Sequence, residues 1–176
     1  MDSINYAKRL QEAILPSDDY LQNKLAEHFI LYRPKDIVAG DFYWVKEVGN
    51  IIYFAAADCT GHGVPGAFVS LVCNNALDKT ILDLGAVSPS QILEHVTKLV
   101  VDNFENSTHA IKDGMDIALC SINKDSLELQ YSGANNPLWL ISDRLETTSE
   151  YLTFNSRNGL SLFEVKATKQ PVGKYN

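Results

Sequence analysis

The chain has little of what nucleic-acid-binding, secreted or membrane-spanning proteins need. Its 15 Lys and Arg are outnumbered by 22 Asp and Glu, giving a formal net charge of −7, whereas nucleic-acid-binding proteins usually carry a basic face. It shows no signal peptide, and its three cysteines lack the spacing of a disulfide framework or a metal site, which favours a reducing cytosol. No apolar run approaches the ~20 residues that span a membrane. We therefore expect a cytoplasmic chain that has neither nucleic acid nor, in this segment, a membrane as its partner.

What the chain does contain fits one globular domain. Of its 176 residues, 45% are hydrophobic and 21% are charged, which is ordinary for a globular protein of this length. Apolar periodicity and end signals predict a helix over 64–84 and another that begins at Pro89. The polar stretch 143–158 is typical of a loop. Runs rich in β-branched, aromatic and small apolar residues predict strands over 36–48, 51–57, 115–122, 127–132, 138–142 and 160–165.

The most informative stretch is 58–66, with the sequence DCTGHGVPG. It follows an apolar run that predicts a buried strand. It leads into a helix whose first turn contains a proline, where a proline loses no hydrogen bond. The glycine-rich turn between strand and helix leaves Asp58 at the rim of a sheet. Upstream, Asp41 offers a second carboxylate on a strand that can pair with the first, so the two are candidate metal ligands.

A predicted hairpin brings these two carboxylates together. Only Gly49-Asn50 separates the two strands, and a two-residue connection of this type makes a tight turn. Counting outward from that turn places Asp41 opposite Asp58 on one face, with Cβ atoms about 5 Å apart. Two carboxylates at that distance repel each other, and neither has a Lys or Arg beside it in the sequence. A bound divalent cation would make the pair tolerable.

The ligand type also suggests the metal. Carboxylates are hard oxygen ligands, which suit Mg2+ or Mn2+ better than Zn2+, a metal that usually takes His or Cys. Two facing carboxylates can bridge a pair of such ions. A site of this kind promotes the hydrolysis of phosphate esters.

Five segments carry a resemblance to a known family: GDFY at 40–43, ADCTGHGVPGA at 57–67, DGMDIAL at 113–119, YSGANNPL at 131–138 and KQPVG at 169–173. Together they resemble the SpoIIE/RsbU-type bacterial phosphatases of the PPM superfamily, the protein phosphatase 2C-like serine/threonine phosphatases. The resemblance implies an α+β fold, a PPM-type α/β sandwich of two mainly antiparallel sheets flanked by helices. It also implies two Mn2+ or Mg2+ ions and a phosphorylated protein substrate, such as an anti-sigma-factor antagonist. By position, Asp41 and Asp58 correspond to catalytic, metal-bridging aspartates, and the main-chain carbonyl of Cys59 to a further metal ligand.

The chain departs from this family toward its C-terminus. The family has further metal-ligand aspartates there, in Thr-Asp-Gly and Asp-Asp-type motifs, and this sequence has neither in that region. Asp113 and Asp116 match a different segment of the family and do not replace these aspartates. We expect both to be strand-edge or turn carboxylates, and the alternative is that they contact the metal. We therefore expect a domain truncated at its C-terminus. Two functions remain open: a metal-dependent protein phosphatase, or a non-catalytic signalling module that keeps the fold.

The N-terminus predicts a separate helix, so the expected division is a linker or signalling helix over 1–16 and the phosphatase domain over 17–176. Asp2-Ser3 can cap this helix, apolar residues recur at helical spacing, and Pro16 ends it. The helix either packs on its own domain or ends a longer helix from an upstream sensor domain. The resemblance supports the second alternative, because this helix mediates dimerisation and switching in the family. An exposed apolar stripe and an open sheet edge also favour a homodimer.

Four other features allow competing interpretations. Residues 61–66 match the G-x-G-x-x-G pattern of dinucleotide-binding proteins, but the preceding strand belongs to a tight antiparallel hairpin and not to a parallel βαβ unit. His62 is expected to face solvent and not to bind metal, because no second His lies nearby. The segment 135–137 is expected to serve first as a turn, with substrate contact as the alternative. Arg33 could meet phosphate, although a solvated charge is the commoner outcome.

Overall fold

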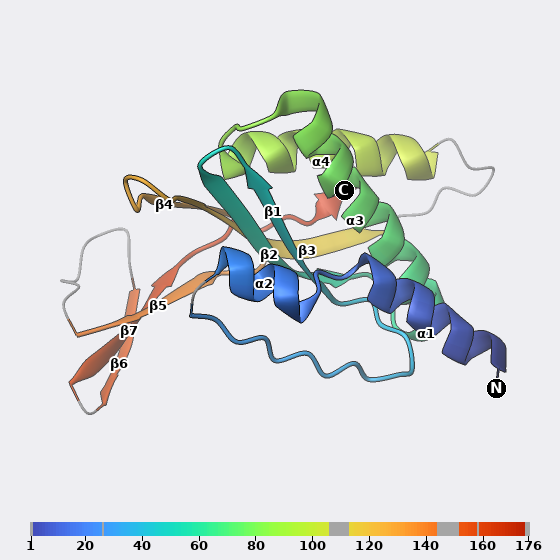
Figure 1. Ribbon diagram of the computed structural model, residues 1–176, viewed down its shortest axis with the longest axis horizontal. Helices are drawn as coiled ribbons and strands as arrows, with labels where there is room; N and C mark the ends of the chain where they lie inside the picture. Colours follow the sequence, from blue (N-terminus) through green and yellow to red (C-terminus); the bar gives the residue numbers. More distant parts are fainter. Residues whose placement is uncertain (1, 26, 106–112, 144–151, 158, 175–176) are drawn as a thin grey trace.

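The computed structural model describes residues 2–25, 27–105, 113–143, 152–157 and 159–174. A five-stranded sheet forms its centre (Figure 1), and every strand pair in it is antiparallel. The short strand β8 (Val172–Gly173) pairs with β3 at one end. The other four strands are neighbours in chain order: β1 (Phe42–Val48), β2 (Ile51–Cys59), β3 (Gly114–Asn123) and β4 (Leu129–Ala134).

Helices cover both faces of this sheet. α3 (Gly63–Leu84) and α4 (Pro89–Glu105) lie on one face, where alternate residues of β2 from Tyr53 to Cys59 join the main hydrophobic core. α2 (Asp18–Lys24) lies on the other face, where Leu21 is the buried anchor of a smaller apolar cluster. Successive side chains of a strand point to opposite faces, so β2 supplies both clusters.

The β1–β2 hairpin has the predicted register. Val48 pairs with Ile51 next to the turn, and Phe42 pairs with Ala57 at the far end. Gly49 takes a φ of 58°, a conformation that glycine adopts without steric cost and that tight hairpin turns require. The local turn therefore fixes which residues face each other along the whole hairpin.

The N-terminal helix α1 (Asp2–Ile14) is fastened to the domain by the buried side chain of Gln11. Its Nε2 donates to the carbonyl oxygen of Ala39 at 2.6 Å and to Ser70 Oγ at 3.0 Å, and its Oε1 accepts from the Ala39 N–H at 2.9 Å. These bonds occupy the main chain of Ala39. Ala39 is therefore not available for pairing within the sheet. β1 begins at Phe42, and the prediction that this strand starts at residue 36 is wrong.

Much of α1 remains open to solvent. Of the apolar stripe predicted from the sequence, Leu10 and Ile14 are 52% and 37% exposed, whereas Ile4 and Ala7 are half-buried, so the stripe is exposed only in part. Neither the division at residue 16 nor the homodimer is tested by this arrangement, and both stay predictions.

A Gln11→Leu variant should unfold more easily than the wild type. The substitution leaves the N–H of the buried Ala39 without its partner and its C=O with only the longer bond from Ser70 Oγ at 3.4 Å, and an unsatisfied buried polar group costs about 1–3 kcal/mol. Urea unfolding measures this loss. Gln22 is exposed, so Gln22→Leu is the matched control and should change stability by less than about 0.5 kcal/mol. Equal midpoints for the two variants would contradict a structural role for the Gln11 amide.

A second, three-stranded antiparallel sheet extends away from the helices (Figure 1). The loop predicted over 143–158 is wrong in part, because β6 lies within it. Asn158-Gly159 in the sequence is a hairpin signal that indicates a strand before it. The rest of the predicted loop, 144–151 and 158, lies outside the described residues. The other predicted helices and strands are present, and the α+β class is confirmed. The three strands, in spatial order, are β5 (Leu138–Ser142), β7 (Leu160–Val165) and β6 (Leu152–Arg157).

Candidate functional site

Asp41 and Asp58 meet at the open end of the hairpin. Asp41 directly precedes β1, and Asp58 is the penultimate residue of β2. Since Phe42 pairs with Ala57, one further step outward brings Asp41 opposite Asp58, close enough for the carboxyl group of Asp41 to raise the pKa of Asp58. The facing carboxylates predicted from the sequence are therefore brought together by the fold.

A third carboxylate faces Asp58 from the other neighbouring strand. Asp116 lies directly opposite Asp58 in the β2–β3 pairing, and its Oδ1 accepts a hydrogen bond of 2.8 Å from Asn135 Nδ2. Asp116 is thus inside β3 and next to the candidate site, and is not a carboxylate in a turn or at a strand end. The sequence did not reveal this position, because two helices separate β2 from β3 and no local turn fixes their register. Asp113 lies just before β3.

The electrostatics of this cluster favour a cation. Burial raises the pKa of Asp58 above its ordinary value, and the charge of Asp41, the hydrogen bond with Asp41 and the charge of Asp116 raise it further. Among the described residues, no Lys, Arg or His forms a salt bridge with Asp41 or Asp58. A bound divalent cation would offset each of these unfavourable contributions.

Main-chain oxygens lie next to the carboxylate pair. A Cβ atom on Gly40 would lie 2.6 Å from the carbonyl oxygen of Gly61 and 3.0 Å from that of Cys59. The Cys59 carbonyl is therefore packed against the residue that precedes Asp41. The Cys59 thiol belongs to the core on the helical face, and a hydrogen bond with Cys73 and burial raise its pKa. A metal-binding role for Cys59 can thus involve only its main chain.

The donor set fits a hard divalent cation but supplies few ligands. Asp41, Asp58 and the Cys59 carbonyl offer oxygen atoms only, as Mg2+ and Mn2+ prefer. In the described ranges, no group of three or more His, Cys, Asp or Glu side chains is placed to hold one ion. Main-chain oxygens and water would have to complete a coordination number of about six.

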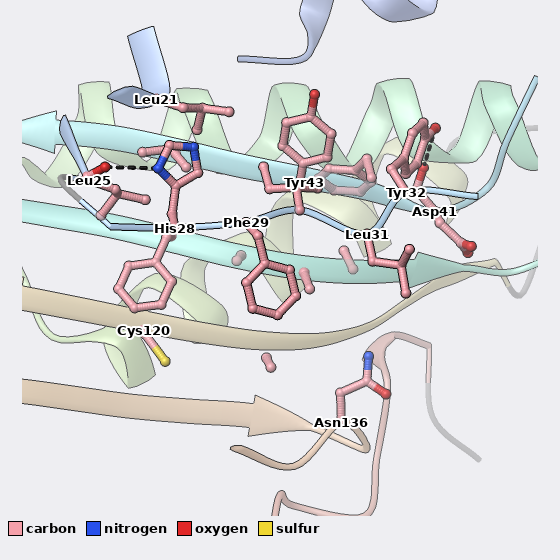
Figure 2. Close-up of a pocket in the computed structure, with 18 of the residues that line it drawn as sticks. Leu21, Leu25, His28, Phe29, Leu31, Tyr32, Asp41, Tyr43, Cys120 and Asn136 are labelled. Carbon is pink, nitrogen blue, oxygen red and sulfur yellow. Dashed lines mark hydrogen bonds between the residues drawn. The ribbon is translucent and has the colours of Figure 1, made fainter. Parts of the chain in front are cut away.

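An apolar groove leads to the carboxylate pair. A cavity of about 890 Å3 lies between the sheet and the strap, which is the segment 27–33 that crosses in front of it, and both Asp41 and Asp58 line this cavity. Figure 2 shows Asp41 near one end of the groove and His28 at the other. The strap residues Phe29 and Leu31 are 91% and 76% exposed. The other lining side chains are mostly apolar and include Leu21, Leu25, Tyr43, Val45, Phe54, Ala56, Ala118 and Leu138.

The competing interpretations of the glycine-rich turn are settled by the fold. β2 is antiparallel to both of its neighbours, so the G-x-G-x-x-G match lacks the parallel βαβ unit of a dinucleotide-binding site. His62 is exposed, as predicted, and its Nδ1 lies 2.8 Å from Asp36 Oδ2.

Comparison with known proteins identifies relatives of the whole fold. The SiaA-PP2C domain of Pseudomonas aeruginosa is 31% identical, with a TM-score of 0.79 over 98% of this chain and 62% of that chain. The PP2C phosphatase domain of SpoIIE from Bacillus subtilis is 20% identical, with a TM-score of 0.53 over 79% of this chain and 34% of that chain. The first likeness confirms the PPM-type fold, and this chain spans 62% of that relative's length. No curated protein matches the sequence.

The remaining findings concern the membrane and the family. Within the described ranges, no helix combines the length and the apolar composition that crossing a membrane requires. The family model of Stage II sporulation protein E (SpoIIE) matches residues 49–165, which is more than half of the sequence. The chain therefore belongs to the SpoIIE family.

Proposed function

We propose that the chain is an Mn2+- or Mg2+-dependent phosphatase domain that hydrolyses phosphoserine or phosphothreonine in a partner protein. The facing pair of Asp41 and Asp58, in a chain of the SpoIIE family, is the observation that carries this proposal. Hydrolysis of a phosphate ester needs positive charge beside the phosphoryl oxygens. A divalent cation bound by this carboxylate pair would provide that charge.

The chain's own residues would hold the metal and set its pH dependence. Asp41 and Asp58 would be its carboxylate ligands, and the Cys59 carbonyl a neutral one. When bound, Mn2+ or Mg2+ polarises phosphoryl oxygens and lowers the pKa of water. The pKa of Asp58 is raised in the metal-free chain, so protons compete with the cation for this carboxylate.

The groove supports a peptide substrate. Its volume of about 890 Å3 is at the upper end of the usual range for ligand pockets, and its apolar walls suit side chains that flank a phosphorylated residue. We propose a phosphoprotein of the anti-sigma-factor antagonist type as the substrate and an upstream sensor domain as the source of regulation. Both follow from the family resemblance, whereas the cytoplasmic location that we propose follows from the cysteines.

A non-catalytic signalling module is the second candidate. The observation in its favour is that the described part of the chain lacks any group of three metal-ligating side chains. Such a module would bind a phosphoprotein in the same groove without hydrolysing it.

Hydrolysis of p-nitrophenyl phosphate and of a phosphoserine peptide should distinguish the two candidates. With Mn2+ present, we expect release of phosphate that stops on chelation and returns when Mn2+ is restored. Half-maximal hydrolysis should need a high concentration of Mn2+, because only two carboxylates and one carbonyl are placed to bind it. If Mn2+ gives no hydrolysis while the phosphopeptide still binds, the second candidate replaces the first.

A further inference from the structure

We propose that the side-chain amide of Asn136 binds the phosphate group of the substrate, an inference that rests on the proposed function. Asn136 lines the same cavity as Asp41 and Asp58. Figure 2 shows its amide directed from the β4–β5 turn toward the groove that also contains Leu31 and Asp41. The amide is therefore placed to donate to an anion held beside the carboxylate pair.

The turn that carries Asn136 is fixed through its main chain. The Tyr131 hydroxyl donates to the Asn136 carbonyl oxygen at 2.6 Å, and the Asn136 N–H donates to the Ala134 carbonyl oxygen at 2.7 Å. Burial raises the pKa of Tyr131 to about 12, so its hydroxyl remains a donor. Gly133 leaves room for this arrangement, because a Cβ there would lie 1.9 Å from the Tyr131 hydroxyl oxygen.

The preceding residue ties the same turn to the carboxylate cluster. Asn135 has a φ of 58°, a left-handed conformation that asparagine adopts more readily than most non-glycine residues. Its N–H donates to the Thr168 carbonyl oxygen at 2.9 Å, and its Nδ2 donates to Asp116 Oδ1 at 2.8 Å. Because Asp116 pairs with Asp58, a continuous set of contacts links the carboxylate pair to the turn.

The two neighbouring amides are used differently. The amide of Asn135 holds the turn, whereas the side-chain amide of Asn136 has no hydrogen-bond partner among the described residues. An amide nitrogen provides two donors without a charge, so it can bind phosphate oxygens without adding an acidic or basic group to the site. The apolar walls of the groove strengthen such a bond, since water competes less well there.

The proposal is tested with Asn136→Ala and Asn136→Asp, measuring the binding of inorganic phosphate by calorimetry with Mn2+ present. Loss of a hydrogen bond to a charged group should weaken phosphate binding about tenfold or more in Asn136→Ala. Asn136→Asp should weaken it further by repulsion, while Mn2+ binding is unchanged or tighter because a carboxylate is added. Asn103→Asp is the matched control: Asn103 lies on α4 and its amide donates to the Leu99 carbonyl oxygen, so phosphate should bind as in the wild type.

Three outcomes overturn the proposal. Unchanged phosphate binding in both Asn136 variants shows that the amide makes no contact. A parallel loss of phosphate binding, Mn2+ binding and thermal stability shows a purely structural role, which the main-chain bonding of Asn136 argues against. Wild-type protein that hydrolyses esters but binds no phosphate overturns this inference and leaves the proposed function standing. Wild-type protein that binds phosphate without hydrolysing esters removes only the proposed hydrolysis, and a loss of binding in the variants then still supports the role of Asn136.

Discussion

An Asp58→Asn variant is expected to lose Mn2+-dependent phosphatase activity by about a hundredfold or more, while its metal-free form unfolds at a higher urea concentration than the wild type. Mutating groups that only orient a metal ligand already costs about 10–100-fold, and Asp58 is placed as a ligand itself. The two measurements move in opposite directions because the carboxylate attracts the cation but is repelled by Asp41 and Asp116. A residue with a merely structural role would lower both.

The gain in stability should depend on pH. The folded-state pKa of Asp58 lies above the ordinary value of 3.8, so the folded chain holds this proton more tightly than the unfolded chain. The stability from that proton is present below the unfolded pKa and is lost as the pH rises through the folded one. The advantage of Asp58→Asn should therefore be full at neutral pH, shrink as the pH falls through the folded pKa, and be gone below about pH 4.

The control for this experiment is Asp125→Asn in the β3–β4 turn. Asp125 accepts a hydrogen bond from Asn50, and an asparagine oxygen can still accept it, so only the charge is removed. We expect no loss of activity and no comparable gain in stability. If metal-free Asp58→Asn is no more stable than the wild type at neutral pH, repulsion within the carboxylate cluster is too weak to explain a cation site.

A Gly40→Ala variant is expected to lose about 1–3 kcal/mol of stability, the usual cost of overpacking a tight site, and to bind Mn2+ more weakly. The added Cβ would lie 2.6 Å and 3.0 Å from two carbonyl oxygens, those of Gly61 and Cys59. Both are main-chain atoms, so they cannot move aside as a flexible side chain would. Relieving the contact displaces the Cys59 carbonyl or Asp41, and Mn2+ titration and urea unfolding report the two effects separately.

Gly85→Ala is the matched control. Gly85 follows α3 with a φ of 70°, and a Cβ there would meet nothing within 4 Å, so its cost of about 1–2 kcal/mol comes from the backbone alone. Mn2+ binding should be unaffected. If Gly40→Ala also leaves Mn2+ binding unchanged, the Cys59 carbonyl does not contribute to the metal site.

The parts of the fold that the sequence predicted are those that local interactions decide. The Gly49-Asn50 turn fixed the hairpin and therefore the facing of Asp41 and Asp58. α1, α3 and α4 were marked by apolar periodicity, with Gly85 just past the end of α3 and Pro89 at the start of α4, whereas α2 was not predicted. β6 was missed because the residues before Asn158-Gly159 are largely polar and resemble a loop, although this dipeptide is a hairpin signal and a predicted strand follows it.

The parts that escaped prediction depend on contacts between distant segments. Asp116 reaches Asp58 only through the pairing of β3 with β2. Gln11 interrupts the predicted strand by bonding to Ala39, a residue 28 positions away. Asn136 was identified as a turn residue, but its place in the cavity beside the carboxylates depends on where β4 ends on the sheet. No periodicity or motif in the sequence encodes these three relations.

The hairpin's symmetry restricts how its length can change during evolution. Asp41 lies as many residues before the Gly49-Asn50 turn as Asp58 lies after it. Deleting one residue from a single arm would separate the two carboxylates and send one of them to the opposite face. Deleting one residue from each arm would keep them facing each other but would turn both toward the helices. Only an equal change of an even number of residues in both arms preserves the pair and its face, so insertions and deletions here should be far rarer than substitutions.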